Sequence, residues 1–185
     1  IGLYEAKKYF KNLLGKTLSY KLKALLDECR GFWEEVWPNG QAERKTTALI
    51  WSLLAASGDQ NVLKEILNEV GGNSMTLAKA ALIALQPINC TERDQAFEVF
   101  YQKWQEKPVI LDSWFALQAS TPRKNILDKV QELLAHNKYD PMAPNAVRAV
   151  LGGFIRNTPG FHALDGTGYM FIACLLYTSD AADEG

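Results

Sequence analysis

The sequence is poor in the residues that build metal centres and disulfide frameworks. It contains only three cysteines and two histidines in 185 residues. The cysteines lie far apart and form no C-x-x-C pair, which argues against a zinc knuckle and against a disulfide-stapled scaffold. Neither histidine belongs to an H-E-x-x-H motif or has a metal-spaced ligand beside it. We expect this chain itself to bind no metal or cofactor. Its scattered, unpaired pattern of cysteines favours a reducing compartment.

A surplus of one charge and a long apolar run are also missing. The chain has 20 Lys and Arg against 21 Asp and Glu, so its formal net charge is -1. Without a basic surplus to bind phosphates, nucleic acid is not an expected partner. The longest apolar stretch, Tyr169 to Tyr177, is far shorter than the roughly 20 residues of a spanning helix, so no membrane partner is expected. The composition, 48% hydrophobic, is that of a globular protein with one core.

Both ends of the chain suggest an excised piece. It begins at Ile1 without a methionine or a leader sequence. The last eleven residues, 175–185, resemble a translated sequencing adapter, and we predict that they form a non-native tail.

Apolar periodicity and turn residues predict helices through the first half of the chain. A helix over 42–56 stops at Ser57-Gly58, and Asp59 is placed to cap a second helix that closes at Gly71-Gly72. The pattern returns with a helix capped by Ser74 or Thr76 and one opened by Thr91. Two further helical segments are expected within residues 1–37.

The second half repeats the pattern. A helix after Pro108 ends at Ser120-Thr121, and Thr121 with Pro122 is predicted to start the next one. The last clear helix begins at Pro144, with its buried stripe predicted at Val147, Val150, Leu151 and Phe154. The first helices of successive pairs begin about every 32 to 35 residues, and no segment has the pattern of a strand. We predict an all-α fold in which antiparallel helix pairs stack as an α-solenoid, similar to HEAT or armadillo repeats.

Few residues suggest chemistry. No nucleophile elbow, phosphate-binding loop or dinucleotide fingerprint is present. His136, near a helix end, is interpreted as a surface residue, and Asp112 as a helix cap. Arg148 lies beside an apolar stripe, where it is either solvated or projects into a cavity or an interdomain seam and holds a carboxylate.

Three ordered segments carry a resemblance to a known family. They are PVILDSWF at 108–115, PNAVRAVLGGF at 144–154 and FHALDGTGY at 161–169. In these motifs and their separations the chain resembles the C-terminal helical domain of bacterial-type aminopeptidase N. The resemblance covers residues 40–173 and extends to residues 1–39, so we assign 1–174 to a partial domain of this kind.

The resemblance implies that the parent protein is a zinc metalloaminopeptidase, which removes N-terminal residues from peptides. Its zinc ligands and catalytic glutamate would lie in an upstream thermolysin-like domain, the expected partner of this chain. The helical domain would be non-catalytic and would line the chamber that peptide substrates enter. The family also favours the cytoplasm. A free-standing helical-repeat scaffold that binds peptides or partner proteins remains the alternative.

The resemblance also assigns expected roles to individual residues. Arg148 matches a family arginine that faces the substrate chamber. A second set matches positions interpreted as architectural: Asp112, Trp114, Phe115, Asn145, Phe161, His162, Asp165, Gly166, Gly168 and Tyr169. Where the family usually has Asn before Pro144, this chain has Ala143, which leaves the helix there without its polar cap.

Overall fold

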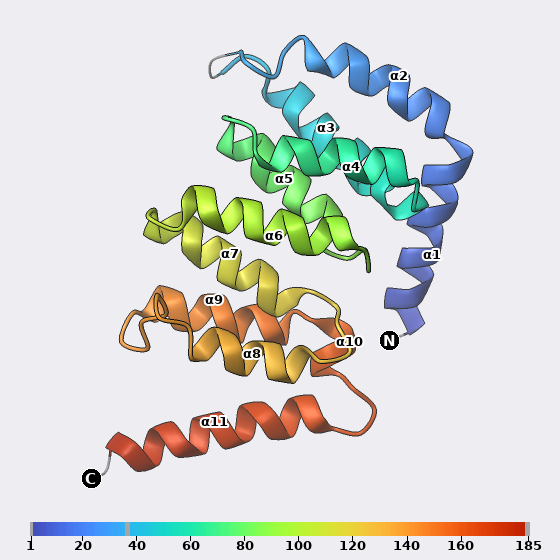
Figure 1. Ribbon diagram of the computed structural model, residues 1–185. Helices are drawn as coiled ribbons and strands as arrows, with labels where there is room; N and C mark the ends of the chain where they lie inside the picture. Colours follow the sequence, from blue (N-terminus) through green and yellow to red (C-terminus); the bar gives the residue numbers. More distant parts are fainter. Residues whose placement is uncertain (1, 36–37, 184–185) are drawn as a thin grey trace. The chain divides into compact units, whose positions relative to one another are not determined.

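The computed structural model describes residues 2–35 and 38–183, with side chains as far as residue 175. Every regular element in this described part is a helix, which confirms the all-α prediction (Figure 1). The helices are α1 (Gly2–Thr17), α2 (Ser19–Arg30), α3 (Gln41–Ser57), α4 (Gln60–Val70), α5 (Met75–Leu85), α6 (Thr91–Trp104), α7 (Pro108–Ser120), α8 (Ile126–Leu134), α9 (Pro144–Ile155), α10 (Thr158–Phe161) and α11 (Thr167–Asp183). They group into two compact units, Gly2–Glu106 and the residues from Lys107 onward.

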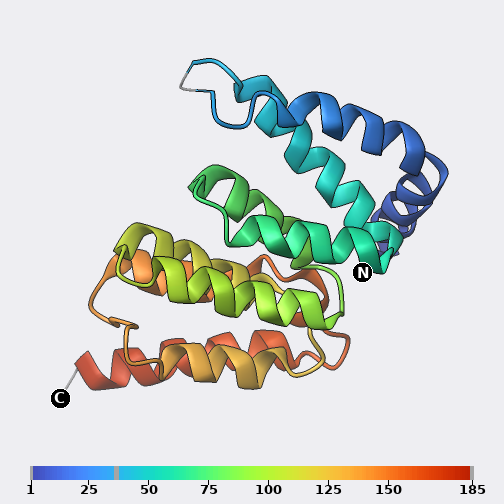
Figure 2. The ribbon, with the colours of Figure 1, turned by 45° about the horizontal axis from the view of Figure 1, so that its top comes forward.

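The first unit is built around α3. This helix contacts α1, α2, α4 and α5, and α4 and α5 lie side by side in both ribbon views (Figures 1 and 2). Trp51 is almost fully buried, and the ring of Trp33 meets it edge-on with centroids 5.4 Å apart. The indole N–H of Trp33 donates to the hydroxyl of buried Thr47 at 3.0 Å, so the polar groups of this cluster are paired inside the core.

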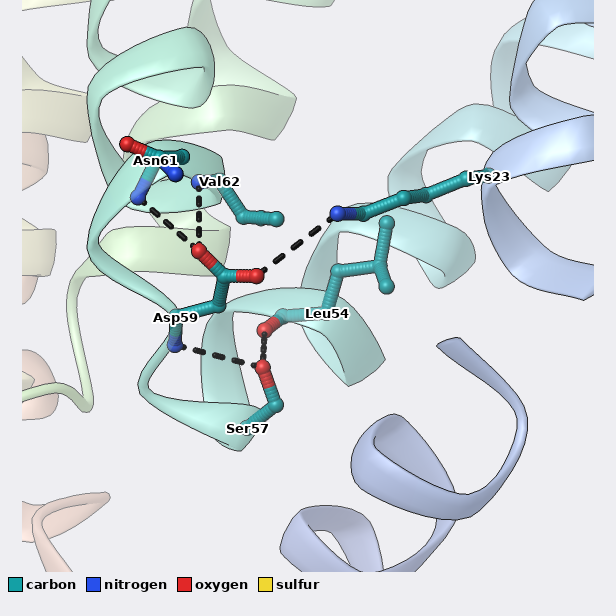
Figure 3. Close-up of polar contacts among 6 residues, drawn as sticks. All are labelled: Lys23, Leu54, Ser57, Asp59, Asn61 and Val62. Carbon is teal, nitrogen blue, oxygen red and sulfur yellow. Dashed lines mark hydrogen bonds and ion pairs between the residues drawn. The ribbon is translucent and has the colours of Figure 1, made fainter. Parts of the chain in front are cut away.

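The turn between α3 and α4 is formed as the sequence predicts. Gly58 ends α3 in the left-handed conformation, with φ of 78°, which glycine adopts without a steric penalty. A carboxylate oxygen of Asp59 then accepts from the backbone N–H groups of Asn61 and Val62, at 2.9 and 3.4 Å (Figure 3). Its other oxygen lies 3.6 Å from the ammonium of Lys23 on α2. One side chain therefore caps α4 and ties α2 to the turn.

The starts of the next two helices are also close to those predicted. Of the two alternatives for α5, Ser74 is the cap, and its hydroxyl accepts from the N–H of Leu77 at 3.4 Å. Thr91 opens α6 as expected, but the preceding Cys90 occupies the cap position and no side chain caps the helix.

In the second unit, α9 packs on α7 through a face of small residues. The predicted stripe is partly wrong: Val150 and Phe154 are buried, but Val147 and Leu151 are only half-buried. The buried face is instead Ala146, Ala149, Val150, Gly153 and Phe154. A Cβ on Gly153 would lie 2.8 Å from the carbonyl oxygen of Ala116, so the two helix backbones approach too closely for any side chain there.

The predicted start of α8 is wrong. Thr121 follows α7, and its hydroxyl donates back to the carbonyl of Leu117 at 2.7 Å instead of accepting from a following helix. The helix α8 begins only at Ile126. The carbonyl of Thr121 accepts at 2.8 Å from the side-chain amide of Asn157, which is 1% exposed. A contact from a distant residue thus sets the conformation after α7.

Aromatic rings pack together at the end of the second unit. The ring of Phe154 is fully buried and meets the rings of Phe161 and Phe171 edge-on, whereas Phe171 and Ile172 are only half-buried. The predicted non-native tail, 175–185, overlaps the last turns of α11, and its residues 184 and 185 lie outside the described part of the chain. Its origin stays a prediction.

Candidate functional site

Arg148, the expected chamber residue, lies on the solvent-exposed side of α9. Its Cγ is 3.7 Å from the position a Cβ of Gly152 would take, and Nη1 of Arg156 is 3.5 Å from the same position. Gly152 therefore leaves a gap flanked by two arginines. The Arg148 side chain is exposed to solvent. Both interpretations of this residue from the sequence remain compatible with its position.

The 161–169 motif joins α10 to α11. The ring of Phe161 packs edge-on against Tyr169, with centroids 4.8 Å apart, and the hydroxyl of Tyr169 hydrogen-bonds to Nδ1 of His162. A Cβ on Gly168 would lie 2.6 Å from the carbonyl oxygen of Gly160. The ring contacts hold the start of α11 against α10, and the lack of a side chain at Gly168 allows the two backbones to come this close.

Asp165 and Gly166 form the turn before α11. One oxygen of Asp165 accepts from both the backbone N–H and the hydroxyl of Thr167, at 3.0 and 2.7 Å. These hydrogen bonds hold the pKa of Asp165 below its ordinary value. Gly166 has φ of 75°, a conformation that favours glycine. In this structure both residues serve the turn.

Asp112 is not a helix cap, which corrects the sequence prediction. It lies inside α7, whose cap position is occupied by Lys107 because the helix already begins at Pro108. Partial burial raises the pKa of the Asp112 carboxyl. The neighbouring Trp114 and Phe115 are buried, with ring centroids 5.3 Å apart.

His136 belongs to this aromatic cluster and is not the exposed residue that the sequence suggested. Its ring lies 5.8 Å from Trp114 and 5.4 Å from Phe115. Nδ1 accepts from the backbone N–H of Lys138 at 3.1 Å. Partial burial, followed by the charges of Lys129 and Lys138, lowers the pKa of His136. The neutral imidazole is favoured, and its contacts are those of packing.

The remaining motif residue, Asn145, is exposed in the first turn of α9. Ala143 occupies the cap position of this helix, and no side chain caps it. This agrees with the prediction from the sequence, because Ala143 replaces the Asn that the family usually has there. The sequence motifs did not reveal Asn157, although Asn followed by Thr158-Pro159 is a helix-start signal. Its Oδ1 accepts from the N–H of Gly160 at 3.2 Å, while its amide group binds the carbonyls that follow α7.

The part of the chain that the structure describes offers no ligand set for zinc. No group of three or more His, Cys, Asp or Glu side chains is gathered there in a way that could hold a metal ion. His136 and His162 are each engaged in separate aromatic clusters. Likewise, none of the described helices has the length and apolar character needed to cross a membrane.

A feature that the sequence motifs did not reveal is a cavity of about 550 Å³ in the first unit, lined by α1, α3 and the end of α5. Lys7, Lys8 and Lys11 all line it. The spacing of Lys11 from Lys7 and Lys8 predicts a basic helix face, because residues three or four apart share a face, but it does not predict a cavity.

Comparison with known proteins identifies the class of this chain. Residues 1–183 match the family described as a domain of unknown function (DUF3458_C) with ARM repeats, and the chain belongs to this family. The match confirms the predicted α-solenoid class, since ARM repeats are stacked helical repeats.

Its relatives are aminopeptidases. The chain is 38% identical over 105 residues to aminopeptidase N of Escherichia coli, covering 56% of this chain and 12% of that protein. It is 33% identical over 117 residues to the Haemophilus influenzae aminopeptidase N, covering 63% and 13%. A crystal structure of Legionella pneumophila aminopeptidase A in complex with aspartic acid superposes with a TM-score of 0.84 at 28% identity, over 97% of this chain and 22% of that one. The chain thus corresponds to the C-terminal helical region of aminopeptidase N and spans only a small part of its relatives' length.

Proposed function

We propose that this chain is the non-catalytic helical domain of a zinc aminopeptidase and forms part of the wall of its substrate chamber. The observation that carries the proposal is the similarity to an aminopeptidase structure along 97% of the chain. In that role the domain limits access to the active site, so that peptides enter and folded proteins do not. Its partners are then the thermolysin-like catalytic domain of the same polypeptide and the peptide substrates, in the cytoplasm.

We assign this chain a positioning role. Zinc would be held by the thermolysin-like catalytic domain, where the resemblance to aminopeptidase N implies that its ligands lie. When bound there, it would activate water for attack on the first peptide bond. What this chain contributes is a helical surface with the exposed guanidinium of Arg148 on α9, which can hold or steer a substrate carboxylate.

The first test is the coding sequence around this segment. We expect an upstream H-E-x-x-H motif followed by a further glutamate ligand. The free-standing scaffold, which the repeat fold supports equally well, needs neither. A start and a stop codon closely flanking the segment would overturn the aminopeptidase proposal and favour the scaffold.

The second test is activity. The purified chain alone should not release p-nitroaniline from leucine p-nitroanilide. Release that a chelator abolishes would show that the chain itself is catalytic.

In the complete enzyme, Arg148→Met should raise KM for peptides with little change in kcat, because a steering contact is made with the bound substrate and the transition state alike. The matched control is Lys124→Met, which removes an exposed cation outside α9 and should leave KM unchanged.

A further inference from the structure

The cavity beside α1 has the dimensions of a ligand site. Its volume of about 550 Å³ lies within the range of small-molecule pockets, about 300 to 1,000 Å³. All of its lining residues belong to the unit Gly2–Glu106. They come from α1, from α3 and from the segment that ends α5, so three separate parts of the sequence build it.

One wall of the cavity is basic. Lys7, Lys8 and Lys11 contribute to it, and Glu5 is the single acidic residue of the lining. Lysine ammonium groups act as compact positive charges that attract anions without demanding a planar, two-point geometry. The cavity therefore offers a net positive lining to an anionic group.

Lys11 is the best placed of these cations. Its Nζ donates to the hydroxyl of Ser52 on α3 at 2.7 Å. Both residues line the cavity, so this hydrogen bond fixes the position of the ammonium group beside it. The group is partly buried, and this burial, followed by the charge of Lys7, lowers the pKa of Lys11. A bound anion would relieve both effects, because it restores a partner to a charge that has lost part of its water.

A second wall is apolar. It is formed by Ala56 of α3 and by Ile83, Pro87 and Ile88 at the end of α5. Ile83 is 44% exposed although it lies in a helix whose other large apolar side chains are mostly buried. An apolar group bound here would remove this surface from water, which favours binding.

We propose that this cavity binds an organic carboxylate with an apolar body, its carboxylate at Lys11 and its body against Ile83 and Ile88. A bare inorganic anion uses only the basic wall, and a neutral apolar compound only the other. No arginine lines the cavity, so the two-point recognition of phosphate is absent. The proposal is independent of the function proposed above.

Calorimetric titration of the chain with three probes tests the proposal. Hydrocinnamate should bind, whereas hydrocinnamamide, of similar shape without the charge, and acetate, with the charge but no apolar body, should each bind at least tenfold more weakly. Equal affinity for the amide would overturn the role of the carboxylate. Equal affinity for acetate would overturn the role of the apolar wall.

Two variants on the same helix locate the site. Lys11→Met should weaken hydrocinnamate binding about tenfold, because a hydrogen bond to a charged group is worth that much. Lys16→Met removes an exposed lysine that does not line the cavity, and should leave the affinity unchanged. An equal loss in both variants would show binding by general surface charge and would overturn the assignment.

A measurement on the unaltered chain guards against a folding defect in the variant. In chain labelled with carbon-13 at lysine Cε, hydrocinnamate should raise the pKa of Lys11. An unchanged Lys11 pKa at saturating ligand would contradict the proposed contact.

Two sources could supply such a carboxylate, a free metabolite or an acidic polypeptide segment. The tripeptide probe acetyl-Leu-Glu-Phe amide, compared with acetyl-Leu-Gln-Phe amide, distinguishes them. Tighter binding of the glutamate peptide than of hydrocinnamate assigns the cavity to a polypeptide segment, and binding of hydrocinnamate alone assigns it to a small molecule. Binding of neither overturns the proposal.

Discussion

The α3–α4 turn and the α7–α9 contact are stabilised in different ways. At the turn, three consecutive residues, Ser57, Gly58 and Asp59, supply the helix stop and the next cap from within the turn itself (Figure 3). At the contact, Gly153 meets Ala116 and Ala119, more than thirty positions away in the sequence. Short-range hydrogen bonds determine the first arrangement, whereas close approach of two backbones determines the second. The turn is therefore visible in the sequence, and the contact is not.

The largest expected effect is a break in the α7–α9 contact by Gly153→Ala. The added Cβ would lie 2.8 Å from the carbonyl oxygen of Ala116 and 3.0 Å from Cβ of Ala119, so the helices must separate. Such overpacking costs about 1–3 kcal/mol in the free energy of unfolding. The measurement is urea unfolding followed by circular dichroism.

The neighbouring glycine provides the matched control. A Cβ on Gly152 would be no nearer than 3.5 Å to any heavy atom, and this atom belongs to the flexible side chain of Arg156. Gly152→Ala should therefore stabilise the chain, by up to about 1 kcal/mol, because alanine favours the helix. Equal effects of the two substitutions would show that helix propensity, and not backbone contact, decides the outcome.

Asn157→Ala should have the next largest effect. Its buried amide donates to the carbonyls of Ala119 and Thr121, at 3.3 and 2.8 Å, and its oxygen caps α10. Truncation leaves buried carbonyls without a donor, which costs about 1–3 kcal/mol. The exposed Asn145→Ala should change the unfolding free energy by less than about 0.5 kcal/mol. A similar small change at Asn157 would mean that water replaces its amide.

The same distinction explains which sequence predictions succeeded. Gly58, Asp59 and Ser74 act on backbone groups within four residues of themselves. Residue type and position were therefore enough to predict the end of α3 and the start of α4, and to limit the cap of α5 to Ser74 or Thr76. The prediction that Thr121 caps the next helix failed because its carbonyl accepts a hydrogen bond from Asn157, a partner 36 positions away. The stripe of α9 was misplaced for a related reason, since small residues, which carry a weak apolar signal, make its closest contact.

For the candidate site, the sequence located the helix that carries Arg148 but could not decide what this residue faces. The motif residues Phe161, Gly168 and Tyr169 were assigned to architecture through a family resemblance, and their ring contacts and close approach have a packing function in this structure. The cavity at Lys11 could not be predicted from the sequence, because part of its lining comes from the end of α5, more than seventy residues further along the chain.

The smallest expected effect concerns the α3–α4 turn, which short-range hydrogen bonds stabilise. Asp59→Ala removes the acceptor for two backbone N–H groups at the start of α4 and should cost about 1 kcal/mol. Asp59→Asn keeps an acceptor oxygen at the cap and removes only the charge, so it should retain most of this stability. If the two variants are equally unstable at neutral pH, the charge and not the cap stabilises the turn.

Acid separates these two contributions further. Desolvation acts to raise the pKa of Asp59, but the N–H groups of Val62 and Asn61 and the charge of Lys23 together hold it below its ordinary value of 3.8. A folded-state pKa below the unfolded one gives stability that is complete above the unfolded value and is lost as the pH falls through the folded value. The difference in unfolding free energy between the unaltered chain and Asp59→Asn should therefore shrink as the pH is lowered from 7 to 3. A constant difference over this range would show that the charge of Asp59 has no part in holding α2 to the turn.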